Sequence, residues 1–214
     1  MLSLSIEAKA QSNDWVVDRF DDIKVLRYEV PGFEELTLKE KLMVYYLSEA
    51  AKAGRDILYD QNFKYNLPIR RTLETLYKSI SDRDSKDFFA FEKYLKKVWF
   101  ANGIHHHYSN DKFTPEFSEE WFRGQLARYI NDTNRQIDND LLCRIIFDKE
   151  LYASRLNQKA GVDVITASAN NYYEGVNQEE VEAFYAAMAA ADEGKPEPIS
   201  YGLNLKLVKN DKGD

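Results

Sequence analysis

The three histidines of this chain, His105, His106 and His107, stand side by side in the stretch "FANGIHHHYSND" (100–111). Histidine is the commonest metal ligand in proteins and the side chain that titrates nearest neutral pH. The stretch therefore has three interpretations. It is a zinc site, it is a loop that lines a binding surface, or it is a polar loop without chemistry.

The spacing of the histidines argues against a zinc site. Neighbouring side chains in an extended loop point to opposite sides, so His105 and His107 are expected to share one face while His106 points away. Two histidines do not complete a site that takes three or four ligands. The sequence also has no His-Glu pair for a helical zinc motif and no nucleophile-elbow motif for serine chemistry. We therefore predict no tight zinc site at His105–His107.

The chain has one cysteine, Cys143, within the apolar run "DLLCRIIF". A reactive thiol needs a basic and open environment, which this run does not suggest. We predict that Cys143 is a small buried apolar side chain.

Composition limits the partners. The 214 residues are 44% hydrophobic and 30% charged, which fits a soluble globular protein of one large domain or two small ones. The net charge is −7 and the pI is about 5.2, whereas phosphate binding favours a basic surface. No apolar run approaches the ~20 residues of a membrane span. We expect neither nucleic acid nor a membrane as a partner.

The loop leaves a predicted helix over 84–100, because "ANG" after it is a natural helix stop. A second helix is predicted over 37–58, starting at the capping box "TLKE". We predict that Leu42 and Leu95, on the apolar stripes of these two helices, pack into one common core. Further helices are predicted from Pro68 through Leu76, over 118–131 and 138–157, and from a second capping box at 177–180.

Two strands are predicted, over 23–30 and over 200–208. The second is followed by "KNDKGD", which has turn chemistry but no returning strand. Either this strand pairs with 23–30, or the natural chain continues past Asp214. The predicted fold class is α+β and helix-rich.

The N-terminal residues 1–17 are predicted to be disordered or the remnant of an export signal. "AKA" at 8–10 is a small-x-small stretch of the kind that precedes signal cleavage, but the apolar part before it is short and has no basic start. We expect a cytoplasmic protein, with export to the periplasm as the alternative.

Three stretches resemble the dipeptidyl peptidase III family of zinc exopeptidases, and its bacterial members most. They are "LTLKEKLMVYYLSEAAKAGRDILYDQN" (36–62), "FFAFEKYLKKVWFANGIHHHYSNDKFTPEF" (88–117) and, more loosely, "ASANNYYEGVNQEEVEAFYAA" (167–187). The likeness extends over nearly the whole chain from about residue 18. It implies that 18–214 is the N-terminal, lower-lobe part of such an enzyme, whose few strands belong to an incomplete β-barrel.

The resemblance also implies a function. The family removes dipeptides from peptide N-termini, and its zinc is held by a helix that this chain does not contain. We therefore expect zinc in the full-length enzyme, no metal ligand in this chain and no catalytic residue in it. The expected partners are the peptide substrate and the remaining C-terminal part of the same enzyme. The alternative is a non-enzymatic helical binding module that shares ancestry with that lobe.

The resemblance gives a role to the loop over 103–110, named here the histidine loop. In the family the loop after this helix faces the substrate cleft, and an aromatic residue that contacts peptide stands where Tyr108 stands here. The expected substrate-binding residues are Tyr108, Gly103, His105 and His107. The histidines replace a run that is usually Asn-Tyr-Lys-Ser-like in the family, and are expected to donate to a peptide carbonyl or to lie at the cleft rim.

Overall fold

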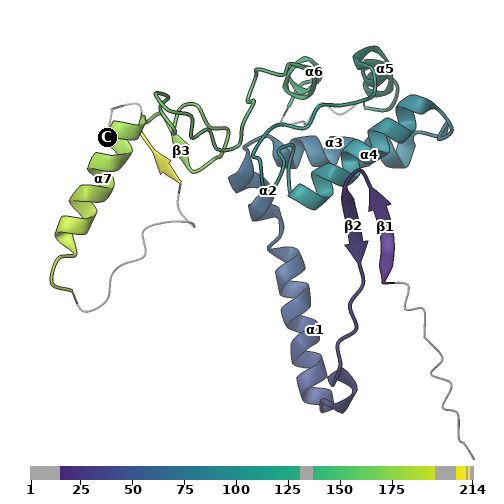
Figure 1. The fold of residues 1–214 in the computed structure, drawn as a ribbon, viewed down its shortest axis with the longest axis horizontal. Coiled ribbons are helices and arrows are strands. Elements are labelled where there is room, and N and C mark those ends of the chain that lie inside the picture. Colours follow the sequence, from purple (N-terminus) through teal and green to yellow (C-terminus); the bar gives the residue numbers. More distant parts are fainter. Residues whose placement is uncertain (1–14, 131–136, 196–205, 211, 213–214) are drawn as a thin grey trace, which may run out of the picture. The chain divides into compact units, whose positions relative to one another are not determined.

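The computed structural model describes residues 15–130, 137–195, 206–210 and 212. Within these residues the fold is α+β and helix-rich, with seven α-helices, one short 3-10 helix and four strands (Figure 1). The residues group into two compact units that divide between Glu49 and Ala50. None of the helices in the described part combines the length and apolar character needed to span a bilayer.

The first unit begins with an antiparallel pair of strands, β1 (Val16–Phe20) and β2 (Ile23–Leu26). β1 begins inside the tail that was predicted to be disordered, and residues 1–14 lie outside the described part. β2 ends at Leu26, four residues before the end of the strand predicted over 23–30. Tyr28, at the far end of the predicted strand, is 75% exposed, because the described residues place no partner strand beside it.

Helix α1 (Leu38–Ala53) follows the short 3-10 helix η1 (Phe33–Glu35) and starts at the predicted capping box. The Thr37 amide donates to the Glu40 carboxylate at 2.8 Å, and the Glu40 amide donates back to the Thr37 hydroxyl at 3.4 Å. No residue of α1 is buried, and Leu42 is 46% exposed. Leu42 belongs to the first unit and Leu95 to the second, so the prediction that they share one core stays a prediction.

The second unit has its core between five helices. They are α2 (Asp56–Asn62), α3 (Asn66–Ser79), α4 (Lys86–Ala101), α5 (Glu119–Tyr129) and α6 (Asn139–Phe147). α3 packs against α2, α4 and α5, and α5 packs against α6. Aromatic rings fill much of the interior, with Phe91 in contact with Phe117, Trp121 and Phe122. Leu95 is completely buried there, as predicted.

The starts of α4, α5 and α6 agree with local capping chemistry, whereas α2 and α3 have no side-chain cap. Two predicted helix ends are wrong, and the first is that of the helix predicted over 37–58, which ends at Ala53. Ser85, one residue after the predicted start, caps α4 by accepting a hydrogen bond from the Phe88 amide at 3.2 Å. α6 ends at Phe147, whereas the helix was predicted to reach residue 157. The chain turns there because the Asp148 carboxylate accepts hydrogen bonds from the backbone amides of Glu150 and Leu151.

The last described elements are β3 (Tyr173–Glu174), α7 (Gln178–Ala191) and β4 (Leu207–Val208). α7 starts at a complete capping box, as predicted. β4 pairs with β3 in parallel, so the described part of the predicted strand 200–208 does not pair with 23–30. Residues 200–205 of that strand lie outside the described part.

Candidate functional site

Helix α4 ends at Ala101 with Asn102 as its C-cap, and the histidine loop follows. Asn102 is left-handed with φ 53°, and Gly103 follows with φ 149°. A Cβ atom on Gly103 would lie 2.2 Å from the Nδ2 atom of Asn66, so the backbone approach requires glycine. Asn66 is fully buried; its amide accepts from the Ile104 N–H and donates to the Tyr59 carbonyl, both at 3.1 Å. Gly103 is itself buried, and it serves this packing.

His105 lies in the core, with 2% of its surface exposed. Its Nε2 is 2.8 Å from the Tyr152 carbonyl oxygen, and its ring packs edge-on against Phe63 with centroids 5.7 Å apart. A carbonyl only accepts, so Nε2 carries the proton and Nδ1 does not. Nδ1 has no hydrogen-bond partner among the described residues. Burial lowers the pKa of His105 to about 4, so the ring is neutral at pH 7.

His106 and His107 place their rings side by side, with centroids 4.6 Å apart. The Nδ1 atom of His106 accepts hydrogen bonds from the backbone amides of Tyr108 (3.2 Å) and Ser109 (3.1 Å). The expectation that His105 and His107 share a face is therefore wrong. The chain forms a turn here, and the alternation of an extended segment does not apply.

Tyr108 is the most exposed aromatic residue of the loop, at 83%. Its ring centroid lies 4.2 Å from that of His107, which in turn lies 5.0 Å from the ring of Phe100 on α4. Phe100 is 43% exposed. These three residues form a row of rings, named here the loop aromatic row, that reaches from the helix to the tip of the turn.

Arg155 holds the turn in place. Its Nε and Nη2 atoms donate to the Asn110 side-chain oxygen at 3.0 and 2.8 Å, and Nη2 also donates to the His107 carbonyl at 3.3 Å. Nη1 donates to the side-chain oxygen of Asn62 on α2 at 3.2 Å. Arg155 is half-buried and has no carboxylate partner in the part of the chain that the structure describes. The guanidinium thus clamps the turn to a core helix through neutral acceptors.

Backbone hydrogen bonds join the loop and three other short segments into one layer. Segment 104–106 bonds to 111–113, 110–112 bonds to 153–155, and Ser154 and Arg155 bond to 169–170. Lys112 fixes this layer to the end of α6, because its Nζ donates to the carbonyls of Ile145, Asp148 and Leu151. Burial lowers the pKa of Lys112. The turn therefore stands on a support that is hydrogen-bonded on several sides.

No group of three or more His, Cys, Asp or Glu side chains in the described ranges is arranged to hold a metal ion. Cys143 is completely buried, and burial raises the pKa of its thiol to about 11. The prediction of a buried cysteine is confirmed.

The predicted site residues separate into two layers. Tyr108 and His107 come together at the surface, whereas Gly103 and His105 lie beneath them in the core. The sequence reasoning missed Arg155 and did not single out Asn110. Asn110 had a local signal, since "SND" favours a turn and a left-handed residue, and its φ is 64°. Arg155 had none, because its partners are 45 and 93 positions away along the chain.

No protein-family model matches this sequence, and no curated protein matches it. The resemblance to dipeptidyl peptidase III accordingly stays a prediction.

Proposed function

We propose that this chain forms the lower wall of the substrate cleft in a zinc-dependent dipeptidyl peptidase, and that Tyr108 contacts the bound peptide there. The observation that carries the proposal is an exposed aromatic side chain on a turn that Arg155 clamps to the core. Such a side chain offers a large contact area, and its support loses little freedom on binding. His107 and Phe100 extend this surface along the loop aromatic row.

The proposal divides the work between two parts of one enzyme. The zinc, which activates the attacking water in this class of enzyme, belongs to the C-terminal part, and this chain contributes substrate contacts. Buried His105 supports the turn as a neutral hydrogen-bond donor to the Tyr152 carbonyl. We propose a cytoplasmic location for the enzyme, with the periplasm as the alternative.

A second candidate is a peptide-binding module without enzymatic activity. It is favoured by one observation: the exposed rings, the clamp and its anchor on α2 all come from residues 62–155 of this chain. The binding surface therefore needs no contribution from another part of an enzyme.

The coding sequence downstream of Asp214 separates the two candidates. A helix with a His-Glu zinc motif about two hundred residues on supports the peptidase, and a stop codon supports the module. The natural full-length protein is then assayed for zinc-dependent release of dipeptides from dipeptidyl-arylamides. Hydrolysis by residues 1–214 alone would contradict the division of work.

Tyr108→Ala tests the proposed contact in that full-length protein. We expect a higher KM, equivalent to about 1–2 kcal/mol for the loss of one stacked aromatic side chain, with kcat little changed. Tyr28→Ala is the matched control, because Tyr28 is 75% exposed and lies outside the loop. Unchanged KM and kcat together with a loss of stability would show that Tyr108 is a packing residue. For the module, the same pair of variants is compared in peptide titrations.

A further inference from the structure

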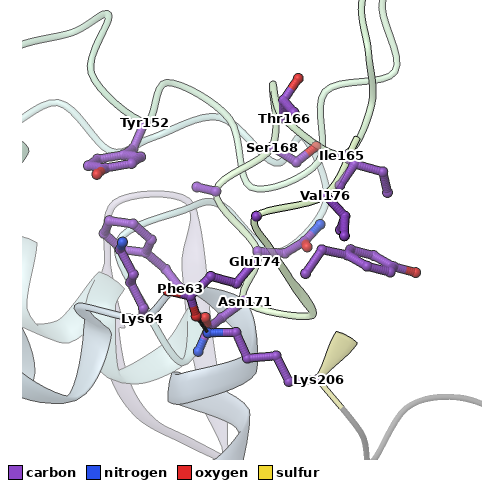
Figure 2. Close-up of a pocket in the computed structure, with 14 residues that line it drawn as sticks. Phe63, Lys64, Tyr152, Ile165, Thr166, Ser168, Asn171, Glu174, Val176 and Lys206 are labelled. Atoms are coloured by element: carbon purple, nitrogen blue, oxygen red, sulfur yellow. Dashed lines mark hydrogen bonds and ion pairs between the residues drawn. The ribbon is translucent and has the colours of Figure 1, made fainter. Parts of the chain in front are cut away.

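A hollow of about 250 Å³ lies next to the histidine loop, among residues 63–64, 165–176, Tyr152 and Lys206 (Figure 2). Tyr152 connects the two places, since its carbonyl holds His105 while its ring lines the hollow. Pockets for drug-sized ligands are typically ~300–1,000 Å³. This hollow therefore suits one or two residues of a peptide.

The walls of the hollow are apolar on two opposing sides. Figure 2 shows Phe63 and Tyr152 on one side and Ile165 and Val176 on the other. The two aromatic rings lie against each other with centroids 4.8 Å apart, so this wall is fixed by the core. An aliphatic or aromatic side chain placed between these walls would lose water contact on both faces.

One polar group in the lining is available for recognition. Asn170 is half-buried, and its backbone amide donates to the Arg155 carbonyl at 3.1 Å. Its side-chain amide has no hydrogen-bond partner among the described residues. A primary amide offers both a donor and an acceptor, which matches a peptide group.

The charges at the rim favour an anion. The Lys206 ammonium is paired with the Glu174 carboxylate, so these two charges offset each other. Lys64 also lines the hollow, and its ammonium forms no ion pair with any residue in the described ranges. Lys64 lies close enough for its charge to help lower the pKa of Glu174, after the larger effect of Lys206. The rim therefore carries two ammonium groups and one carboxylate, and the Lys64 ammonium lies over the Tyr65 ring, 5.1 Å from its centroid.

We propose that this hollow binds the C-terminal residue of a short peptide. The apolar side chain lies between the two walls, the preceding peptide group bonds to the Asn170 amide, and the terminal carboxylate pairs with Lys64. An apolar body, an amide and a carboxylate are the three features of such an end, and the lining has one element for each. The proposal does not rest on the peptidase function, because it concerns free peptide ends and needs no cleavage.

Two small probes test the proposal with the purified chain. N-Acetyl-L-leucine has the amide, the apolar side chain and the carboxylate, while N-acetyl-L-leucinamide lacks only the charge. Titrations followed by ¹H–¹⁵N NMR should show saturable shifts at the amides of Asn170, Gly175 and Val176. We expect the acid to bind about tenfold more tightly than the leucinamide, as for one charge-assisted hydrogen bond.

Three variants assign the binding to the proposed contacts. Lys64→Met should reduce the affinity for the acid to that for the leucinamide, and Lys78→Met should leave it unchanged. Lys78 is an exposed lysine on α3 outside the hollow. Ile165→Trp should fill the space and weaken both probes. Equal affinity for both probes, or full affinity in Lys64→Met, would overturn the carboxylate assignment. Full affinity in Ile165→Trp, or no saturable shift with either probe, would overturn the site itself.

Discussion

Acidification should destabilise this protein through His105 in a defined pH window. The buried ring has a pKa of about 4 in the folded chain, against 6.5 for an ordinary histidine. Between these values the unfolded chain binds the proton and the folded chain does not. The stability that depends on neutral His105 is therefore fully present above pH 6.5 and is lost as the pH falls toward 4.

The size of the effect follows from the two pKa values. Each pKa unit corresponds to about 1.4 kcal/mol, so His105 should contribute about 3 kcal/mol of pH-dependent stability. The ring is only 2% exposed, and solvent screening reduces this value little. Asp148 and Asp163 also have lowered pKa values, held down chiefly by backbone hydrogen bonds. Their contribution is lost mainly below their ordinary pKa of 3.8, outside the His105 window.

The assay is urea unfolding followed by circular dichroism at pH 4.5, 5.5, 6.5 and 7.5. His105→Gln keeps an N–H donor for the Tyr152 carbonyl but does not titrate, so its stability should change much less across these pH values than that of the wild type. Parallel slopes for the wild type and His105→Gln would refute the reasoning. Ring ¹⁵N shifts would check independently that Nε2 carries the proton at pH 7.

Three further predictions concern the support of the loop and the core. Gly103→Ala should lower the free energy of unfolding by about 3 kcal/mol, because the added Cβ would meet Asn66. In the control Gly124→Ala, in α5, the added Cβ meets nothing within 4 Å, and the change should stabilise the protein by up to ~1 kcal/mol. Equal effects of the two changes in urea melts would contradict this reasoning. Arg155→Lys keeps the charge but loses the fork of donors that holds the turn. Chymotrypsin should therefore cleave the chain after Tyr108 at least ~5-fold faster than in the wild type. The control Arg144→Lys, which changes an exposed arginine, should leave the cleavage rate unchanged. Leu95→Ala should cost about 2–5 kcal/mol, and Leu42→Ala, at a half-exposed position, less than ~1 kcal/mol; similar costs would show that α1 is covered in solution.

Features encoded by neighbouring residues could be predicted from the sequence. Both capping boxes form as expected, because the cap and its partner are three positions apart. The burial of Leu95 and Cys143 also followed from apolar runs with helical spacing. The 37–58 helix shows the limit of that reasoning, since periodicity indicates a helix but does not identify what covers it.

The candidate site was predicted in part. Exposed Tyr108 was identified, but the division of the loop into a buried and a surface layer was not. That division depends on Asn66 and Tyr152, which contact the loop from 38 and 47 positions away. Contacts of this kind leave no periodic pattern in the sequence. Glycine at position 103 was noticed as a helix stop, while its need to pass close to Asn66 became visible only in three dimensions.

The way the loop is held determines how it responds to pH. Arg155 binds amide and backbone oxygens, and Lys112 binds backbone carbonyls, so neither cation depends on a carboxylate that acid would neutralise. These contacts keep their acceptors at every pH at which the chain is folded. His105 is different, because its proton uptake would place a buried charge beside two cations. The layer beneath the turn is therefore sensitive to acid at His105, whereas the contacts of Arg155 and Lys112 are not.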